Sequence, residues 1–406
     1  MKVLQINAVN KLSSTGRNVY ELSEYLNNNG NSCVVAFSKG PSVTPENEFK
    51  IGNRIDVKIH GLLSRILGKQ GYFSKNATRK LLKFMTKYKP DAVVLNNLHG
   101  NYINLPMLLR YLSKKNIATI AVLHDCWFYT GRCCHYTTDN CYKWQEKCKD
   151  CPSLKKYNVS WFFDRTSKMQ KDKIELFGSI PRLAVVGVSE WITNEAIKSP
   201  VFKNAKEFKR IYNWIDTNTF KPCDTKKERE KFGLKDKKVI LSVANGWNKE
   251  KGLNTILELS YKLSADERIM LVGNIPEYIE LNEKIIHIPT TNSIQELVVY
   301  YSMADVFLQP SLEETFGKVT AEALSCGTPV VCFNSTANPE LVGDGCGAAI
   351  DVGNTSALLK EIRNIMSLGK EMFSNKCRSF AEQNFSITTS LDGYLSLIEK
   401  MKEVDE

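Results

Sequence analysis

The 406-residue sequence contains no apolar run that approaches the roughly 18 residues of a membrane-spanning helix. Its first residues, MKVLQINAV, form a stretch that is too short and too strand-like for a secretory signal peptide. It also contains no internal repeat and no low-complexity segment. Together with an ordinary 43% hydrophobic and 24% charged share, these absences predict a globular, cytoplasmic protein.

Acidic side chains are outnumbered, since 55 Lys and Arg residues face 44 Asp and Glu residues and give a net charge of +11. Such an excess favours anionic partners. Between Lys58 and Lys89, apolar residues recur at helical spacing beside basic ones, which predicts two helices. Their basic faces are either simply solvated or dock onto an anionic membrane surface. No nucleic-acid-binding signature accompanies the charge, so nucleic acid is not an expected partner. The basic residues of this stretch include Arg65, Lys69, Arg79, Lys80, Lys83 and Lys87.

Strand-like apolar runs alternate with helix-like segments along the chain, as in parallel sheets with crossover helices. The first half begins with a strand at Val3–Ile6 and a loop at Asn7–Thr15, and the pattern restarts with a strand at Lys238–Val243. Two long helices, about Thr355–Leu368 and Ile387–Met401, close the chain. The sequence therefore predicts an α/β fold with two doubly wound domains, whose ligands bind outside the carboxyl ends of the strands.

The most informative stretch runs from Pro310 to Val331 and reads PSLEETFGKVTAEALSCGTPVV. It follows an apolar strand and places Glu314 and a Phe-Gly turn before an amphipathic helix that carries Glu322. The amino terminus of a helix offers free N–H groups and a partial positive charge to an anion. Carboxylates on either side of it can accept hydrogen bonds from neutral hydroxyls. This combination suits a sugar diphosphate.

In this context the stretch resembles the retaining, nucleotide-sugar-dependent glycosyltransferases of family 4, which have the GT-B fold. The resemblance extends over nearly the whole chain. It implies two Rossmann-like domains facing a central cleft and a UDP- or GDP-sugar as donor. The implied parts are an acceptor-binding domain at 1–210 with a cysteine-rich insertion at 126–152, a nucleotide-sugar-binding domain at 211–385, and a terminal helix at 386–406 that crosses back to the first domain.

The same resemblance assigns roles to the residues of the 310–331 stretch. It implies that Glu322 binds the ribose hydroxyls and that Glu314 accepts hydrogen bonds from the donor sugar. Gly317 leaves room for close approach of the ligand, because it has no side chain. The backbone N–H groups that would face the diphosphate are those of Phe316, Gly317, Lys318 and Val319.

A second donor element is the segment SVANGWNKEKGLNTILELS. Lys251, at a helix start, matches the family's characteristic lysine, which offsets the charge that grows on the departing diphosphate. The family's usual arginine is replaced here by Asn245. Either Lys249 reaches in to replace it, or Lys251 acts alone with the helix terminus.

Two further segments match donor-binding parts of the family. Gly273 in LVGNIP matches the glycine that ends a strand beneath the nucleotide, and Pro289 lies in the segment HIPTT (His287–Thr291), which matches the loop that binds the base through its backbone. The chain contains neither an Asp-x-Asp motif nor a P-loop pattern. We therefore expect a transferase without a catalytic metal.

The first half supplies the expected acceptor side. Gly16 and Arg17 stand where the family has a glycine-rich loop that faces the diphosphate, although an ordinary N-capped helix start would read the same way. His124 follows the strand Ala118–Leu123 and matches a family histidine that contacts the donor sugar beside the reacting bond, whereas a lone strand-end histidine is more often structural. Asp125 is expected to orient His124 or the acceptor. Asn97 and His99, in LNNLHGN, are expected to line the acceptor site unless they only satisfy the backbone of their own loop.

The cysteine-rich insertion contains Cys133, Cys141, Cys148 and Cys151, with seven, six and two residues between them. Four thiolates with one Cys-x2-Cys pair suit a tetrahedral structural zinc in a reducing compartment. Because the first two cysteines do not form a second such pair, free thiols that pack a loop and redox disulfides stay open as alternatives. The pattern HDCWFYTGRC…CP resembles a subgroup of bacterial polysaccharide glycosyltransferases.

The resemblance as a whole implies a retaining glycosyltransferase with His124, Glu314 and Lys251 as catalytic residues. Its acceptor is expected to be a glycan, lipid-linked, at the inner face of a bacterial membrane, in the assembly of capsule, O-antigen or exopolysaccharide. No protein nucleophile is evident, which fits front-face attack assisted by the departing phosphate. Two alternatives remain: a sugar-nucleotide epimerase of the same fold, and a catalytically silent subunit. The replacement of the family's arginine by Asn245 favours the silent subunit.

Overall fold

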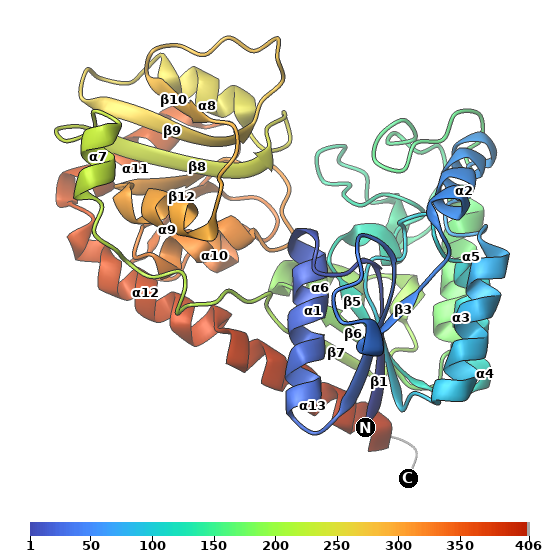
Figure 1. Cartoon of the computed structure of the whole chain (residues 1–406). Helices are drawn as coiled ribbons and strands as arrows, with labels where there is room; N and C mark the ends of the chain where they lie inside the picture. Colours follow the sequence, from blue (N-terminus) through green and yellow to red (C-terminus); the bar gives the residue numbers. More distant parts are fainter. Residues whose placement is uncertain (404–406) are drawn as a thin grey trace. The chain divides into compact units, whose positions relative to one another are not determined.

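The computed structural model describes residues 1–403 and divides into two compact units. Unit 1 contains Met1–Ile211 and the described residues from Leu391 onward, and unit 2 contains Tyr212–Ser390 (Figure 1). The sequence predicted a domain boundary between residues 210 and 211. It also predicted a terminal segment that begins at 386, whose last residues, 404–406, lie outside the described part of the chain.

Unit 1 is built on a seven-stranded parallel sheet in the order β3-β2-β1-β4-β5-β6-β7. Its central strands are apolar and buried along their whole length, as expected when helices cover both faces of a parallel sheet. The strands are β1 (Lys2–Val9), β2 (Ser32–Lys39), β3 (Glu48–Lys50), β4 (Ala92–Leu95), β5 (Ala118–Leu123), β6 (Leu183–Gly187) and β7 (Glu207–Arg210).

The helices of unit 1 lie on the two faces of this sheet. On one face α3, α4 and α5 pack side by side, and α1 lies on the other (Figure 1). The last helix, α13, joins unit 1 from Leu391 onward, where Lys400 pairs with Glu207 at 2.8 Å. The helices are α1 (Ser13–Asn28), α2 (Arg54–Leu67), α3 (Lys75–Tyr88), α4 (Leu105–Lys114), α5 (Thr166–Gly178), α6 (Glu190–Ile197) and α13 (Ile387–Glu403).

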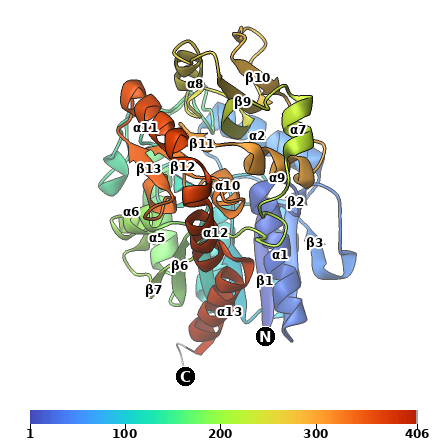
Figure 2. The same ribbon diagram turned by 90° about the vertical axis from the view of Figure 1, so that its left-hand side faces the viewer.

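Unit 2 contains a six-stranded parallel sheet in the order β10-β9-β8-β11-β12-β13. One apolar core lies between this sheet and helices α8 and α11, while α9 and α10 lie on the opposite side (Figures 1 and 2). The strands are β8 (Lys238–Gly246), β9 (Glu267–Asn274), β10 (Ile285–Ile288), β11 (Val306–Gln309), β12 (Val330–Phe333) and β13 (Gly347–Ile350). The helices are α7 (Lys226–Lys231), α8 (Leu253–Ser260), α9 (Ile294–Met303), α10 (Lys318–Ser325), α11 (Thr355–Leu368) and α12 (Glu371–Phe385).

Both sheets have a topological switch point, where the chain winds outward in two directions from a pair of central strands. These pairs are β1 with β4 in unit 1 and β8 with β11 in unit 2. The loops at the carboxyl ends of such a pair diverge and leave room for a ligand. The predicted α/β fold is thus confirmed, and the loops after these four strands are where functional side chains should gather.

Three local predictions were wrong. The predicted loop Asn7–Thr15 is shorter, because pairing with β2 extends β1 to Val9 and α1 already begins at Ser13. Three helices close the chain rather than two, since α12 lies between the predicted pair and buries only three residues, too few to give a clear periodicity. The predicted loop His287–Thr291 begins inside β10, where His287 pairs with Leu271 of β9.

Candidate active site

The loops that follow β8 and β11 come together in unit 2. The ammonium group of Lys251 lies 2.6 Å from Glu314 Oε1, and the Leu312 N–H donates to the Glu250 carbonyl at 2.8 Å. Gly252 permits this approach, because a Cβ atom there would lie 2.2 Å from the Pro310 carbonyl oxygen. The switch point therefore holds a cation and a carboxylate from two distant segments in direct contact.

The start of α10 offers an uncompensated positive helix end. Gly317 adopts the left-handed region with a φ of 82°, and no side chain caps the helix. Among the described residues, the buried Gln309 Nε2 and Thr320 Oγ1 have no hydrogen-bond partner. They lie 3.6 and 3.5 Å from the position that a Cβ atom on Gly317 would take. Unpaired buried polar atoms are rare in proteins, so their position beside a free helix terminus indicates a site for an anionic or hydroxyl-rich ligand.

Glu322 lies in the second turn of α10 and is only 7% exposed. The hydroxyl of the fully buried Tyr301, from α9, donates to Glu322 Oε2 at 2.8 Å. Burial and the neighbouring Glu322 carboxylate raise the pKa of Tyr301 well above its usual value, so the phenol keeps its proton. The position of the carboxylate is thus fixed by a donor that lies 21 residues earlier in the chain.

Asn245 lies near the end of β8, and the loop that follows this strand holds Lys251 in place but leaves Lys249 without a contact to Glu314. Asn248 Oδ1 accepts a hydrogen bond from the Lys251 backbone N–H at 2.8 Å. Asn245 and Lys249 are both exposed, and the described residues offer the Lys249 side chain no hydrogen bond or ion pair. Of the two lysines considered from the sequence, the structure brings Lys251 to Glu314.

Gly273 has a structural role that needs no nucleotide. Its φ is 121°, and a Cβ atom there would lie 1.9 Å from the Ala244 carbonyl oxygen of the neighbouring strand. Its own carbonyl accepts a hydrogen bond from His287 Nε2 at 2.8 Å. Pro289 follows directly on β10 and is exposed. Both residues lie near the carboxyl ends of strands, as predicted.

In unit 1, His124 follows directly on β5. Its Nε2 lies 2.9 Å from Asn96 Oδ1, which follows β4. Burial lowers the pKa of His124 to about 4, so the ring is neutral at physiological pH. With the Asn96 oxygen as acceptor, Nε2 carries the single ring proton.

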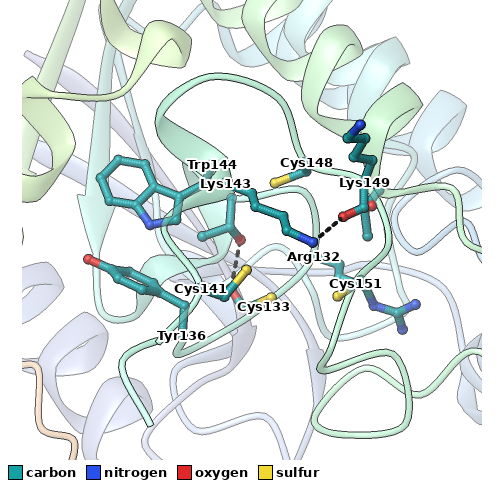
Figure 3. A pocket seen from close by; sticks show the side chains of 11 residues that line it. Arg132, Cys133, Tyr136, Cys141, Lys143, Trp144, Cys148, Lys149 and Cys151 are labelled. Carbon is teal, nitrogen blue, oxygen red and sulfur yellow. Dashed lines mark hydrogen bonds between the residues drawn. The ribbon is translucent and has the colours of Figure 1, made fainter. Parts of the chain in front are cut away.

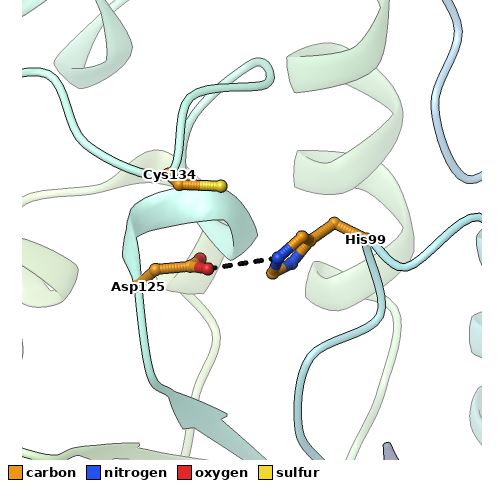
Figure 4. Close-up of side chains that lie close together, drawn as sticks. All are labelled: His99, Asp125 and Cys134. Atoms are coloured by element: carbon orange, nitrogen blue, oxygen red, sulfur yellow. Dashed lines mark ion pairs between the residues drawn. The ribbon is translucent and has the colours of Figure 1, made fainter. Parts of the chain in front are cut away.

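Asp125, the next residue, lies at the centre of a three-residue cluster (Figure 4). Its Oδ2 is 3.4 Å from His99 Nε2, and its Oδ1 accepts the Trp127 backbone N–H at 2.8 Å. Cys134 completes the cluster, and its pKa is raised by burial and by the Asp125 carboxylate. The structure therefore joins the predicted residues Asp125 and His99, and adds Cys134 from the insertion.

The β1–β4 switch point contains the other predicted residues of unit 1. Asn7 Oδ1 accepts the Asn97 backbone N–H at 3.1 Å, which ties the two strand ends together. Gly16 is buried against the β1 end, where a Cβ atom would lie 3.0 Å from Val9 Cγ2. Arg17 is exposed in the second turn of α1. No side chain caps α1, so the alternative of an ordinary N-capped helix start does not hold.

Two family models match this chain. The model described as Glycosyltransferase Family 4 matches residues 15–219, half of the chain, and the model described as glycosyl transferases group 1 matches residues 224–384. The chain belongs to glycosyltransferase family 4. The resemblance to family 4 is thereby confirmed, whereas the resemblance of the cysteine-rich insertion to a subgroup stays a prediction. The two matched ranges follow the two structural units.

Relatives of this family 4 member are distant. N-acetyl-alpha-D-glucosaminyl L-malate synthase from Bacillus anthracis is 25% identical over 45% of this chain and 50% of its own length. O-antigen chain mannosyltransferase B from Escherichia coli is 43% identical over 30% of this chain and 27% of its own length. The chain thus spans about half the length, or less, of these curated relatives.

The fold of this family 4 member recurs in solved structures. Anabaena HepE in complex with UDP superimposes with a TM-score of 0.69 at 15% identity, over 98% of this chain and 100% of that one. This likeness, together with the two parallel sheets, identifies the fold as GT-B, as predicted.

Some side chains of the candidate site were missed by reasoning from the sequence. Tyr301 holds Glu322, and Gln309 and Thr320 flank the start of α10. Gln309 could have been noticed, because it is a polar residue in the otherwise apolar strand VFLQ. Tyr301 and Cys134 gave no local signal, since only the tertiary fold brings them to their partners.

Proposed function

We propose that the protein transfers a sugar, with retention, from a nucleoside-diphosphate sugar to a glycan acceptor. The observation that supports this most is the contact of Lys251 with Glu314 beside the free start of α10. A cation and a helix terminus at one place can offset the charge of a leaving diphosphate. The adjacent carboxylate can accept hydrogen bonds from sugar hydroxyls. Anabaena HepE was solved with UDP and with UDP-glucose, which supports a donor of this chemical class.

The donor roles follow from the chemistry of each group. Lys251 and the N–H groups of Phe316 to Val319 bind the diphosphate, Glu314 binds the donor sugar, and Glu322 binds the ribose. The missing arginine at Asn245 leaves Lys251 as the main cation of the site. Gln309 and Thr320 supply two further polar atoms beside the start of α10.

The acceptor roles belong to unit 1. His124 is neutral and donates its single ring proton to Asn96 Oδ1, so its other ring nitrogen, Nδ1, is an acceptor that can bind a hydroxyl group of the donor sugar. Asp125, His99 and Asn97 orient the acceptor. In the proposed front-face reaction the departing phosphate oxygen takes the proton of the acceptor hydroxyl, and no catalytic metal takes part.

We further propose that unit 1 docks onto an anionic membrane, where a lipid-linked acceptor for surface polysaccharide would be found. Within the described residues, no helix is long and apolar enough to cross a bilayer. However, α2 and a neighbouring loop expose large apolar side chains, and the loop is tied to α2 by the Trp161 N–H, which donates to the Arg65 carbonyl at 2.7 Å. These residues form the apolar ridge: Ile55 (66% exposed), Ile59 (53%), Leu62 (48%), Leu67 (40%), Trp161 (43%), Phe162 (68%) and Phe163 (43%).

A basic groove borders this apolar ridge. Its volume is about 650 Å³, and Leu67 belongs to both features. Its lining carries six basic side chains and one acidic residue, Asp172. Exposed apolar groups beside clustered cations match the chemistry of an anionic bilayer surface. The basic residues of the groove are Lys69, Lys75, Arg79, Arg110, Arg165 and Lys168.

The test is an assay of nucleoside diphosphate released from a panel of UDP-, GDP- and ADP-sugars, with and without a glycan acceptor. We expect release from one donor class, and a loss of at least about 100-fold in Lys251→Ala and Glu314→Ala, since each removes transition-state stabilisation of roughly 3 kcal/mol. Lys262→Ala, an exposed lysine of the same unit paired with Glu258, should act like the wild type. An epimerised donor would instead indicate the epimerase, and binding without turnover the silent subunit.

A further inference from the structure

The cysteine-rich insertion lacks the usual means of holding a loop in place. Between the end of β5 and the start of α5, only two three-residue 3₁₀ helices occur, Cys126–Phe128 and Lys143–Gln145. Irregular segments of this length are uncommon in compact proteins unless they are functional or held by a cross-link. All twelve cysteines of the chain are free, so no disulfide provides that cross-link.

Four cysteines of the insertion surround one small space. Cys133, Cys141, Cys148 and Cys151 all line a cavity of about 20 Å³ (Figure 3). A cavity of this size is large enough for a single ion or water molecule. None of the four residues lies in a helix, strand or turn, so one ion at their centre would join parts of the chain that share no regular structure.

The charged side chains that line this cavity are basic, so a negatively charged group inside it would be stabilised. Arg132 lines the cavity and is 3% exposed, and its Nε and Nη1 atoms have no hydrogen-bond partner within the described residues. Lys143 and Lys149 line the same cavity, and no carboxylate does. Four thiolates around a divalent cation carry a net charge of −2, and their sulfur atoms accept N–H hydrogen bonds.

From this geometry we propose that Cys133, Cys141, Cys148 and Cys151 bind one structural zinc ion. A tetrahedral site has zinc–sulfur distances of about 2.3 Å. Among the described residues, the set whose ligand atoms already lie within 4.8 Å of one another is His99, Asp125 and Cys134. The proposed site therefore requires the four thiol side chains to rotate toward the cavity when the ion binds. The backbone that carries the proposed ligands is already anchored, since Gln170 Oε1 accepts the Cys148 N–H at 2.6 Å and Asp164 Oδ2 accepts the Cys151 N–H at 2.8 Å.

The cluster of His99, Asp125 and Cys134 is the competing metal site, and it is explained without an ion. The Asp125 carboxylate lies 3.4 Å from His99 Nε2 and is bonded to the Trp127 N–H, so it already has proton-bearing partners. In contrast, Arg132 Nε and Nη1 have no hydrogen-bond partner within the described residues. The two sites share no ligand, so substitutions can tell them apart.

The first experiment measures metal by mass spectrometry in the full chain, purified with a reductant and without chelators. We expect about one zinc per chain in the wild type, a loss of most of it in Cys148→Ser and in Cys151→Ser, and full retention in Cys134→Ser and His99→Ala. A wild type without zinc, or a loss of zinc confined to the Cys134 and His99 variants, would overturn the proposal.

A second measurement keeps the proposal testable if the serine variants fail to fold. Wild-type protein loaded with Co²⁺ should show the strong sulfur-to-metal absorption of a tetrathiolate site, and Cys134→Ser should leave that spectrum unchanged. A weak spectrum typical of one sulfur ligand would contradict the assignment. So would a thiol-blocking analysis of fresh protein that finds disulfides among the four cysteines.

Discussion

At the scale of single residues, the proposed donor site depends on side chains that other groups hold in place before any ligand binds. Glu314 contacts Lys251, and Glu322 contacts the buried Tyr301. Such preorganisation lowers the free-energy cost of ordering the site during the reaction. The roles can therefore be separated by substituting the residue that fixes a carboxylate, such as Tyr301, as well as the carboxylate itself, such as Glu322.

Tyr301→Phe should weaken nucleotide binding less than Glu322→Gln does. The tyrosine only fixes the carboxylate, whereas Glu322 itself would accept two ribose hydroxyl hydrogen bonds. A hydrogen bond to a charged group contributes about 1.5 to 3 kcal/mol, so we expect about 100-fold weaker binding for Glu322→Gln and about tenfold for Tyr301→Phe. Calorimetric titration with the preferred nucleoside diphosphate measures both. Equal losses in the two variants would contradict the assigned roles.

His60 makes stability depend on pH. Its Nε2 accepts the Gly71 N–H at 3.2 Å and its Nδ1 bonds to Ser74 Oγ at 2.8 Å, and burial lowers the pKa to about 4. Because the folded pKa lies below the unfolded value of about 6.5, the unfolded chain binds more protons between these values. Stability contributed by the neutral ring is therefore full above pH 6.5 and is lost as the pH falls toward 4.

We expect this single group to lower the free energy of unfolding by about 2 kcal/mol between pH 7.5 and pH 5. Denaturant unfolding at the two pH values measures it, with His60→Gln as the variant that cannot titrate. The variant should be less stable than the wild type at pH 7.5 and lose less stability on acidification. A difference between the two proteins that stays constant with pH would show that His60 does not titrate in this range.

At the scale of elements, the start of α10 combines an unusual backbone conformation with the proposed diphosphate site. Gly317 starts the helix in the left-handed region, and no side chain caps the helix start. Other residues pay about 1 kcal/mol or more in that region. A substitution there therefore tests conformation and ligand access together.

Gly317→Ala should cost about 1 kcal/mol of stability and reduce turnover by at least about tenfold, because the new methyl group faces the proposed diphosphate position. Gly353→Ala is a matched control. Its φ is 83°, against 82° for Gly317, and a Cβ atom there would meet nothing within 4 Å. Unfolding midpoints and steady-state kinetics of both variants separate the two effects. Equal activity in the two variants would argue against a ligand at the start of α10.

Helices with strong periodicity were predictable, and elements set by tertiary pairing were not. The bounds of α11 agree with those read from the sequence, because this helix buries residues at helical spacing. The helix predicted to carry Glu322 is α10. The short edge strands β3, β7 and β13 depend on pairing with a neighbour. The pairing of Lys251 with Glu314, 63 residues apart, could be expected only from the family resemblance. Periodicity and spacing gave no hint of it.

At the scale of the whole molecule, charge and exposed apolar area in unit 1 have consequences for location in the cell. The apolar ridge and the basic groove are separate features that meet at Leu67. Either alone would bind a bilayer weakly and reversibly. Together they predict binding that depends on both lipid charge and ionic strength.

Liposome flotation tests that prediction. We expect the wild type to float with vesicles that contain anionic lipid, and to float less with neutral vesicles or at high salt. The double variant Arg79→Glu, Arg110→Glu should lose the charge-dependent part, and Trp161→Ala, Phe162→Ala the apolar part. Lys262→Glu, on the surface of unit 2, is the control for a charge reversal outside unit 1. Flotation that ignores lipid charge, or that falls equally in the control, would contradict membrane docking by unit 1.

The central claim is that unit 2 binds a nucleoside diphosphate at the switch point between β8 and β11. Thermal unfolding with UDP, GDP, ADP and CMP tests it most directly, because a ligand that binds the native state raises the unfolding temperature. We predict that one nucleoside diphosphate raises the midpoint of the wild type and of Glu382→Gln, an exposed glutamate on α12, but not of Glu322→Gln or Lys251→Ala. A shift that survives in all four proteins, or no shift with any nucleotide, would contradict the claim.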